Sequence, residues 1–380
     1  MKNSNFHIYP SYFTNESRIL RIAEALISHG VFDKIILLGY WKSGLPRKEF
    51  ISRSVEIVRI DTMMSKSLNH KWLNLFGFLI FYLRVLLISI RSRPQLVNAH
   101  SLTVLPLCVF IKLCTGSKVL YDPHELETES NDSQGVRKRI AKIIETLFIK
   151  FANHTIVVSS SIQLWYKEKY QINNIGVIRN VPAVKQNLVK DTILRESLNL
   201  NDDQRLFIYS GMQSSGRGIE SLLEIFKEIP SNHIVFMGYG PLNTLILEYE
   251  NQYSNIHLLG AVNPNEVTRY VSGADVGISY IENTCLSYYY SLPNKVFEYI
   301  SAGVPFICSD FPDVRREFEE SDVSWFVKDE IELKRVISEM STSQIFEKKE
   351  KVAIHRMKWN WGTESIKLID EYQKLQLANK

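Results

Sequence analysis

Residues 206–226 read LFIYSGMQSSGRGIESLLEIF, and this stretch decides the fold. It opens with an apolar run, Leu206 to Tyr209, that has the length and composition of a fully buried strand. A loop of small residues follows as far as Gly218, and apolar residues then recur at helical spacing from Ile219 to Phe226. A buried strand that leads through a glycine-rich loop into a helix is typical of a parallel, doubly wound sheet.

The same alternation of short apolar runs and longer helical patterns extends in both directions. Further strands are predicted at residues 6–9, 35–38, 55–58, 96–98, 119–121, 155–158, 176–178, 234–237, 256–259, 276–279 and 305–308. A polar stretch from Val181 to Asn201 separates two such series. The pattern predicts an α/β chain of two doubly wound, Rossmann-like domains that face each other across a cleft. We expect these domains at residues 1–183 and 184–360, with a helix over 361–380 that returns to the N-terminal domain.

Composition excludes several classes of protein. The chain has 380 residues, of which 45% are apolar and 23% charged, as in ordinary globular domains. Four cysteines without CxxC spacing favour neither a disulfide framework nor a zinc site, and they suggest a reducing compartment. No secretory signal is expected at the N-terminus. No GxGxxG follows the first strand, and neither GxxxxGK[ST] nor HExxH occurs, which argues against dehydrogenases, P-loop enzymes and zinc proteases.

Charge is divided unequally along the chain. Residues 1–185 hold 25 Lys and Arg against 13 Asp and Glu, whereas residues 186–380 hold 20 against 28. The basic half suggests an anionic partner, lipid or nucleic acid, although unequal but solvated faces would also explain it.

One apolar segment lies within that basic half. Residues 72–90 (WLNLFGFLIFYLRVLLISI) carry the single charge Arg84 and have basic flanks at Lys71, Arg91 and Arg93. Because Arg84 lies inside the segment and the next strand must return to the same sheet, a helix at the membrane surface is favoured over a spanning helix. A plain core helix is the alternative.

The glycine-rich loop is a candidate anion site. Its small residues, Gly211 among them, let backbone N–H groups point at a phosphate, and Arg217 adds a bidentate donor at the start of a helix. A tight turn with a solvated arginine is equally consistent with the sequence.

A second candidate segment is residues 288–305, YYYSLPNKVFEYISAGVP. Pro293 suits the first position of a helix and Gly303 its C-terminal stop. Lys295 could then reach phosphate, and Glu298 could accept hydrogen bonds from a ribose. A surface pair of Lys295 and Glu298 is the alternative reading.

The first domain offers residues 122–126, DPHEL, directly after a predicted strand. Reactive groups lie at such strand ends, so His124 is a candidate at the reacting centre with Asp122 or Glu125 orienting it. Arg18, before the helix 19–29, is a candidate for an anionic ligand. A helix-capping aspartate with a surface histidine, and a helix charge at Arg18, are the alternatives.

These segments resemble glycosyltransferase family 4, retaining nucleotide-sugar enzymes of GT-B fold, over nearly the whole chain. The resemblance is carried by residues 17–30 (the first helix), 122–126 (D-x-H-E-L), 177–182 (VIRNVP), 236–241 (FMGYGP), 260–262 (GAV) and 292–299 (LPNKVFEY). The last of these is typical of a PNK-type subgroup that makes bacterial surface polysaccharides.

The resemblance implies a role for each matching position. Gly211 and Arg217 would bind the donor pyrophosphate, Glu298 the ribose, and the backbone around Val262 the base. His124 would contact the transferred sugar near its anomeric carbon, with Arg18 and Glu125 on the acceptor side. The remaining donor contacts are expected from Tyr290, Ser291, Leu292, Pro293, Asn294 and Lys295.

Two positions depart from the family pattern. Tyr290 stands where the first acid of E-x7-E would fall, and Met212 replaces a common arginine. Without that acid we expect same-face displacement, in which the departing phosphate helps to deprotonate the acceptor. No metal or other cofactor is expected, because protein cations would stabilise the leaving group.

The resulting expectation is a retaining hexosyltransferase that moves sugar from a nucleotide diphosphate, UDP by family frequency. Its acceptor would be a lipid-linked saccharide or polysaccharide in bacterial O-antigen, lipopolysaccharide or capsule biosynthesis. The enzyme would be cytoplasmic and peripheral on the inner face of the membrane, with no nucleic-acid partner. An epimerase or phosphorylase on the same fold, and a binding partner with a decayed site, are the alternatives.

Overall fold

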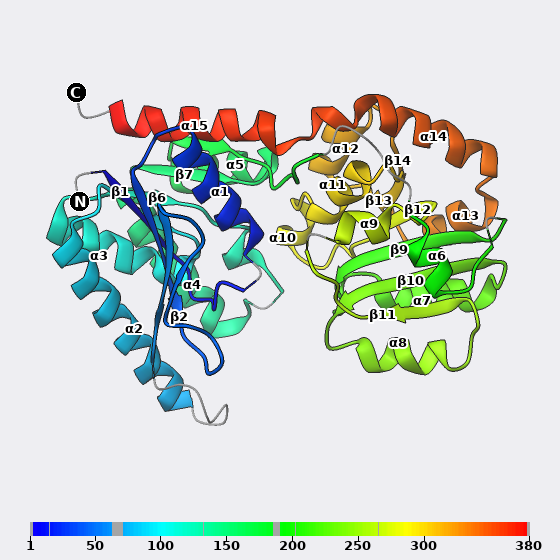
Figure 1. Cartoon of the computed structure of the whole chain (residues 1–380), viewed down its shortest axis with the longest axis horizontal. Coiled ribbons are helices and arrows are strands. Elements are labelled where there is room, and N and C mark those ends of the chain that lie inside the picture. The colour runs from blue at the N-terminus through cyan, green and yellow to red at the C-terminus, as the bar shows by residue number, and fades with distance from the viewer. Residues whose placement is uncertain are drawn as a thin grey trace. The chain divides into compact units, whose positions relative to one another are not determined.

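The computed structural model describes residues 3–14, 16–62, 71–131, 133–184, 191–201, 203–264 and 266–377, without the side chains of residues 71–75, 376 and 377. The chain divides into two compact units (Figure 1). The first comprises Met1–Arg179 and Ser365–Lys380, and the second comprises Asn180–Glu364.

The first unit is built on an eight-stranded sheet of order β3-β4-β2-β1-β5-β6-β7-β8. All of its pairings are parallel except that of β3 with β4. Its strands are β1 (Ser4–Ile8), β2 (Lys34–Tyr40), β3 (Lys48–Phe50), β4 (Val55–Ile60), β5 (Leu96–Ala99), β6 (Lys118–Tyr121), β7 (His154–Val157) and β8 (Ile175–Val177). Strands β1 and β5 are buried along their whole length, because helices cover both faces of the sheet.

The helices of this unit form two layers. They are α1 (Ser17–Ser28), α2 (Lys71–Ser92), α3 (Leu105–Thr115), α4 (Gly135–Phe148), α5 (Ser160–Tyr170) and α15 (Trp361–Leu377), with 3-10 turns η1 (Leu102–Val104), η2 (Glu127–Glu129) and η3 (Ile149–Phe151). The connections from β4 to β5 and onward to β8 all run in one direction along the sheet, so right-handed crossovers place α2, α3, α4 and α5 on one face. The connection from β1 to β2 runs in the opposite direction and places α1 on the other face. Helix α15 lies on the face of α1, where the ring of Tyr372 packs 6.3 Å from that of Phe32.

The second unit carries a six-stranded parallel sheet of order β11-β10-β9-β12-β13-β14. Its strands are β9 (Arg205–Met212), β10 (Asn232–Tyr239), β11 (Ile256–Leu259), β12 (Val276–Ser279), β13 (Phe306–Ser309) and β14 (Ser324–Val327). Its helices are α6 (Ile193–Ser197), α7 (Ile219–Glu228), α8 (Asn243–Glu250), α9 (Val267–Val271), α10 (Leu286–Tyr289), α11 (Asn294–Ser301), α12 (Pro312–Phe318), α13 (Glu330–Glu339), α14 (Thr342–His355) and the turn η4 (Arg356–Lys358).

Both sheets contain a point where the strand order reverses. In the first unit this point lies between β1 and β5, and in the second between β9 and β12. The carboxyl edge at such a reversal is where open α/β sheets bind ligands, because the flanking connections leave to opposite faces there. The predicted α/β class with two parallel-sheet, Rossmann-like halves is therefore confirmed.

Candidate functional site

The glycine-rich loop lies at the reversal point of the second sheet. Strand β9 pairs with β10 as far as Met212 opposite Tyr239, and Gly211 lies opposite Gly238. A Cβ on Gly238 would lie 2.1 Å from the Gly211 carbonyl oxygen, so only glycine permits this approach of the two strand ends. The loop then enters α7 through Gly218, whose φ of +71° is left-handed. Backbone N–H groups of the first turn of α7 consequently face the loop, as in anion sites at helix N-termini.

Helix α11 is attached to the same strand ends by one tyrosine. The hydroxyl of Tyr299 donates to the Ile278 carbonyl oxygen at 2.9 Å and accepts from the Ser210 N–H at 3.1 Å. Pro293 is the N-cap of α11, so the helix begins one residue later than the sequence suggested. Gly303, with a φ of +80°, follows its end as predicted. The anchor holds the side chains of α11 beside the loop after β9.

Two cations meet at this place. Lys295 is only 7% exposed, and its Nζ lies 3.4 Å from the ring centre of Tyr209 and 4.0 Å from the position of a Cβ on Gly211. Within the described residues Lys295 Nζ and Arg217 Nε have no hydrogen-bond partner. The Arg217 guanidinium lies 5.6 Å from the ring centre of Tyr288. Both cations thus make cation–π contacts with tyrosine rings. Their N–H groups remain available to donate hydrogen bonds to an anion.

The electrostatics of Lys295 agree with that geometry. Burial lowers the pKa of Lys295 well below its usual value, the positive charge of Arg217 lowers it further, and Glu298 opposes the shift. A bound diphosphate would supply the missing counter-charge and restore the protonated amine. The buried amine of Lys295 therefore destabilises the fold when no anion is bound, and a bound anion would remove that cost.

The other residues predicted to bind the sugar donor differ in burial and in the contacts that they make. Tyr290 and Ser291 connect α10 to α11, and the Ser291 hydroxyl has no partner within the described chain. Leu292 is 8% exposed and packs into the core of the unit, so its side chain is structural. Asn294 is exposed, and Glu298 is half-buried one turn after Lys295. Val262 follows β11 and packs partly against the core.

Gln213 was not singled out from the sequence, although it lies within the loop. It is fully buried, and neither its amide nitrogen nor its amide oxygen has a partner among the described residues. Because buried amides are almost always hydrogen-bonded, Gln213 is a further candidate for contact with a ligand. Its polarity beside the glycines was the available signal.

A pocket of the second unit lies elsewhere. It is lined by Arg205 and Asn232, the first residues of β9 and β10, and by residues of the α13–α14 region. This is the amino edge of the sheet, whereas ligands of such sheets bind at the carboxyl edge. We therefore do not assign the donor to it.

In the first unit, Asp122 is the centre of a buried polar chain. Arg18 donates to its carboxylate at 2.8 and 3.3 Å and to the Ile178 carbonyl oxygen at 3.0 Å. On the other side His100 Nδ1 lies 3.1 Å from Asp122 Oδ2. Burial alone would raise the pKa of Asp122, but the Arg18 guanidinium and the His100 N–H hold it well below its usual range. The guanidinium of Arg18 is thus engaged within the chain and positions Asp122.

The chain continues inward through His7, and its tautomers follow from the partners. An ionised carboxylate only accepts, so His100 carries its proton on Nδ1. Its Nε2 then accepts from His7 Nδ1 at 2.7 Å, and His7 Nε2 accepts from the Asn5 amide at 3.0 Å. Burial lowers the pKa of His7 well below its usual value, and His100 adds to the shift, so a neutral His7 is consistent with this assignment.

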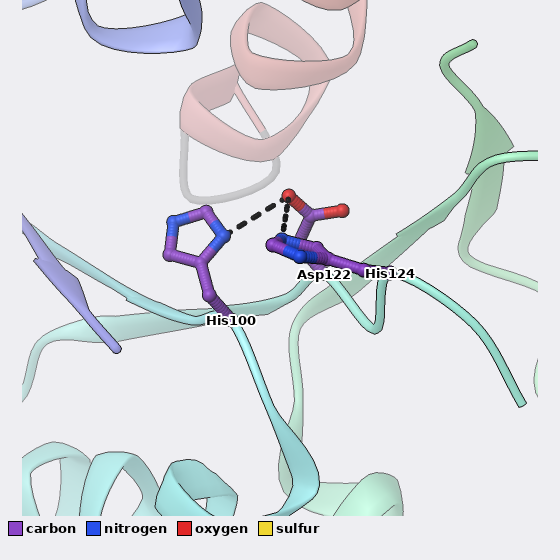
Figure 2. Close-up of side chains that lie close together, drawn as sticks. All are labelled: His100, Asp122 and His124. Carbon is purple, nitrogen blue, oxygen red and sulfur yellow. Dashed lines mark hydrogen bonds and ion pairs between the residues drawn. The ribbon is translucent and has the colours of Figure 1, made fainter. Parts of the chain in front are cut away.

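His124 is the solvent-facing member of the group. Its Nε2 lies 3.8 Å from Asp122 Oδ2, and its side chain is 30% exposed (Figure 2). Within the described chain this nitrogen has no hydrogen-bond partner. Burial lowers the pKa of His124 to about 3, against the opposing charge of Asp122, so the ring is neutral near pH 7. A neutral imidazole can accept a hydrogen bond from a hydroxyl or donate one to it. Glu125, the other predicted neighbour, is exposed.

The group of His100, Asp122 and His124 has the residue types of a metal site, and their ligand atoms lie within 4.8 Å of one another. The donors, however, are already committed. Both ring nitrogens of His100 are hydrogen-bonded, and Arg18 holds the carboxylate of Asp122. A divalent cation would have to displace the guanidinium and compete with its charge, so the residues fit a polar chain better than a metal.

His100 was missed by the sequence analysis. It directly follows β5, as Asp122 directly follows β6, so the strand-end rule that selected Asp122 applies to it equally. Glu127 was also missed. Its carboxylate accepts from Ser101 Oγ at 3.0 Å and the Leu102 N–H at 2.8 Å, and burial raises its pKa to about 7 against those two hydrogen bonds.

Comparison with known protein families matches part of the second unit. Residues 190–356 match the family model described as Glycosyl transferases group 1. A curated relative, chitobiosyldiphosphodolichol beta-mannosyltransferase of Kluyveromyces lactis, is 22% identical over 305 residues, which cover 70% of this chain and 67% of that protein.

Solved structures share the fold over almost the whole chain. Sucrose-phosphate synthase from Thermosynechococcus elongatus matches with a TM-score of 0.83 at 16% identity, covering 99% of this chain and 100% of that one. HepE of Anabaena, solved with UDP-glucose, has a TM-score of 0.74 at 11% identity, covering 98% and 100%. WaaG, described as a glycosyltransferase involved in lipopolysaccharide biosynthesis, has a TM-score of 0.70 at 13% identity, covering 97% and 98%. These likenesses establish the GT-B fold.

Proposed function

We propose that this chain transfers a hexosyl group from a nucleoside-diphosphate sugar to a lipid-linked saccharide or polysaccharide, with retention of configuration. The observation that carries the proposal is the pair of cations in the second unit. Lys295 is buried without a hydrogen-bond partner among the described residues, beside Arg217 and the loop after β9. Burying an uncompensated charge is expensive, so such a site is best explained by an anionic ligand.

The donor's diphosphate is the anion that fits this chemistry. The N–H groups at the start of α7 and the side chains of Arg217 and Lys295 would bind its oxygens, and Glu298 would accept hydrogen bonds from the ribose. Val262 would lie near the base. HepE, which shares the fold, was solved with UDP-glucose, and this supports UDP as the first nucleotide to test.

In the proposed reaction the bond from the anomeric carbon to the leaving phosphate oxygen breaks. An acceptor hydroxyl forms the new bond on the same face, and its proton passes to the departing phosphate. Negative charge grows on the diphosphate as the bond lengthens, so Arg217 and Lys295 stabilise the transition state more than the ground state. His124 would hold the transferred sugar by a hydrogen bond from its imidazole ring, with Asp122 positioning the ring. Tyr290 replaces the acid of the E-x7-E pattern, and this favours displacement without a covalent intermediate at that position.

We propose a metal-independent reaction because two protein cations can stabilise the leaving group. In the first unit, Arg18 holds the carboxylate that a metal would need. Activity that survives treatment with a chelator would support this reading, and activity restored only by a divalent cation would contradict it.

The names of two similar proteins support a proposal for the acceptor and the cellular role. The name of the Kluyveromyces lactis relative describes mannosyl transfer to a saccharide on dolichyl diphosphate, and WaaG is described as a glycosyltransferase involved in lipopolysaccharide biosynthesis. We propose by analogy a lipid-linked acceptor, membership of the PNK-type family 4 subgroup, and a role in bacterial surface glycan synthesis at the inner face of the cytoplasmic membrane.

A thermal-shift screen with UDP, GDP, CDP and dTDP tests the site, because a ligand that binds only the folded state raises the melting temperature. Transfer is then assayed with sugar donors of the nucleotide that binds. We expect Arg217→Ala to lower turnover by about 10²–10³-fold, as for other lost transition-state donors, and Glu298→Gln to weaken donor binding by about tenfold. Arg269→Ala, which removes an exposed arginine on α9, is the matched control.

Full activity in both variants would refute the assignment of the site. Tight nucleotide binding without turnover on any sugar donor would instead identify a binding protein with a decayed site.

A further inference from the structure

One layer of helices in the first unit exposes far more apolar surface than the other. On α2, α3 and α4, here called the three-helix face, eleven large apolar side chains are 38–70% exposed. They are Phe76, Leu79, Leu83, Leu87, Ile90, Phe110, Leu113, Val136, Ile140, Ile143 and Leu147. On the opposite layer, α1 and α15, Ile366 is the single such residue among the described side chains. Monomeric proteins rarely expose a contiguous apolar surface of this kind without a partner.

These exposed residues form stripes along adjacent helices. On α4 they recur as Val136, Ile140, Ile143 and Leu147, which is the spacing of one helical face. Helix α3 packs against both α2 and α4, and the rings of Phe110 and Phe148 lie 6.2 Å apart between α3 and α4. The stripes therefore belong to one continuous layer.

The helices of the three-helix face are predominantly basic, although Lys138 and Lys142 are paired with Glu129 of η2 at 2.8 and 2.6 Å. These helices contain eight basic residues, Lys71, Arg84, Arg91, Lys112, Arg137, Lys138, Arg139 and Lys142, and one acid, Glu145. Glu145 is fully buried, where it accepts hydrogen bonds from Tyr166 at 2.6 Å and Tyr170 at 2.7 Å. By contrast, α1 and α15 together contain four basic and four acidic residues.

We infer that the three-helix face docks on an anionic lipid bilayer, with its aliphatic stripes in the interfacial region and its Arg and Lys side chains on the headgroups. Exposed aliphatic stripes flanked by basic residues are the pattern of helices that lie in a membrane interface. A nucleic acid offers no apolar surface for the stripes, and a second copy of this face would bring like charges together. Charge and apolar surface thus select the same occupant.

The helices would lie on the bilayer and not pass through it. Phe81, Val85 and Ser89 of α2 are fully buried against the rest of the unit. Among the described residues, none of the helices combines the length and apolar composition needed to cross a membrane. This inference deepens the proposed function, since a lipid-linked acceptor is presented at such a surface.

Vesicle co-sedimentation of the full chain tests the inference. We expect wild type to bind vesicles of phosphatidylcholine with phosphatidylglycerol more tightly than vesicles of phosphatidylcholine alone, and added salt to weaken that preference. Leu83→Ser with Ile140→Ser removes two exposed apolar anchors and should weaken binding to both vesicles by tenfold or more. Arg137→Gln with Arg139→Gln should weaken binding to the anionic vesicles by about fivefold per residue and leave binding to neutral vesicles unchanged.

Ile366→Ser with Lys367→Gln makes matched changes on the opposite layer and should bind as wild type. Equal losses in this control, or undiminished binding in the two face variants, would overturn the inference. So would a wild-type dimer in sedimentation velocity that Leu83→Ser with Ile140→Ser dissolves, because a second copy would then cover the face. The nucleotide-induced thermal shift is measured in every variant. If wild type shows the nucleotide-induced thermal shift but does not bind vesicles, the membrane-docking inference is wrong and the proposed donor site stands. If wild type binds vesicles but shows no thermal shift with any nucleotide, the proposed donor site is wrong and the docking inference stands.

Discussion

Lys295 is expected to lower the stability of the fold while it contributes to the proposed binding of the diphosphate. Its folded-state pKa is lowered by burial, so protonation of Lys295 near neutral pH favours the unfolded chain, where the amine is fully hydrated. Lys295→Met keeps the contact with the Tyr209 ring and removes the charge. We expect this variant to be more stable than wild type by about 1 kcal/mol, which is roughly 2–4 °C in melting temperature for a unit of this size.

The same substitution should abolish the shift caused by nucleoside diphosphates. In wild type a bound diphosphate raises the pKa of Lys295 again, so binding takes up a proton at a pH between the free and bound values. Calorimetry in buffers of different ionisation enthalpy measures that uptake, and Lys295→Met supplies the baseline for the nucleotide's own ionisation. Unchanged proton uptake in the variant would show that Lys295 does not meet the diphosphate.

Gly238 makes a second prediction at this scale. A Cβ there would meet the Gly211 carbonyl oxygen at 2.1 Å, and the φ of +146° is unfavourable for other residues. Gly238→Ala should therefore displace the loop after β9, cost about 1–3 kcal/mol and weaken nucleotide binding. Gly260→Ala is the control, since a Cβ at Gly260 has nothing within 4 Å. Urea unfolding and nucleotide titration of both variants provide the measurements, and equal behaviour would contradict the argument.

The sequence predicted single residues where a motif surrounds them. Asp122 and His124 were found because DPHEL follows a strand, and Arg217 and Lys295 because glycine or proline marks the local turn. His7 was not found, since a lone histidine in an apolar strand has no local signal of its role. Its partner His100 is 93 positions away, and only the pairing of β1 with β5 brings the two rings together.

At the scale of elements, α11 depends on the hydroxyl of Tyr299. That group bridges the Ser210 N–H and the Ile278 carbonyl oxygen, and Gly277 leaves room for the ring, since a Cβ there would lie 2.4 Å from it. Tyr299→Phe leaves two buried backbone groups with a lost partner, which costs about 1–3 kcal/mol. We expect weaker nucleotide binding as well, because α11 carries Lys295 and Glu298.

Tyr270→Phe on α9 is the control for this variant, because Tyr270 is partly buried in the same core without making that bridge. Thermal unfolding and nucleotide titration compare the two variants. If Tyr299→Phe lost stability but bound nucleotide normally, the hydroxyl would have a purely structural role.

Elements differ in how well the sequence predicts them. The central parallel strands were predicted because strands buried on both faces are continuous apolar runs. Strand β3 was missed because it is a three-residue antiparallel edge, Lys48-Glu49-Phe50, with alternating exposure. Strand β14 was missed although Trp325 to Val327 is apolar, because a serine precedes it and no glycine-rich turn marks its start. Edge strands need fewer buried residues, so their local pattern is weaker.

At the scale of the whole molecule, the two units differ in how the chain builds them. The second unit, Asn180–Glu364, is one continuous segment with its own sheet and contains both candidate cations. The first unit is discontinuous, since it needs Ser365–Lys380 from the end of the chain. In that segment Leu368 and Tyr372 are fully buried, Glu371 lies 2.7 Å from His154, and Tyr372 is hydrogen-bonded to Asn98.

This difference predicts the behaviour of separated fragments. Residues 180–364 alone should fold cooperatively and show the same nucleoside-diphosphate thermal shift as the full chain, because every residue proposed to bind the nucleoside diphosphate lies within them. Residues 1–179 alone should aggregate or unfold at a lower temperature, because the surface that Leu368 and Tyr372 cover would be open to water, at about 1.5–3 kcal/mol for each side chain. Adding a peptide of residues 361–380 should restore their stability, and the same peptide with Tyr372→Ala should not.

Circular dichroism melts and nucleotide titrations measure both fragments. A stable fragment 1–179 that ignores the peptide would show that α15 is dispensable to its unit, and a folded fragment 180–364 that binds no nucleotide would show that the donor site requires residues outside the second unit.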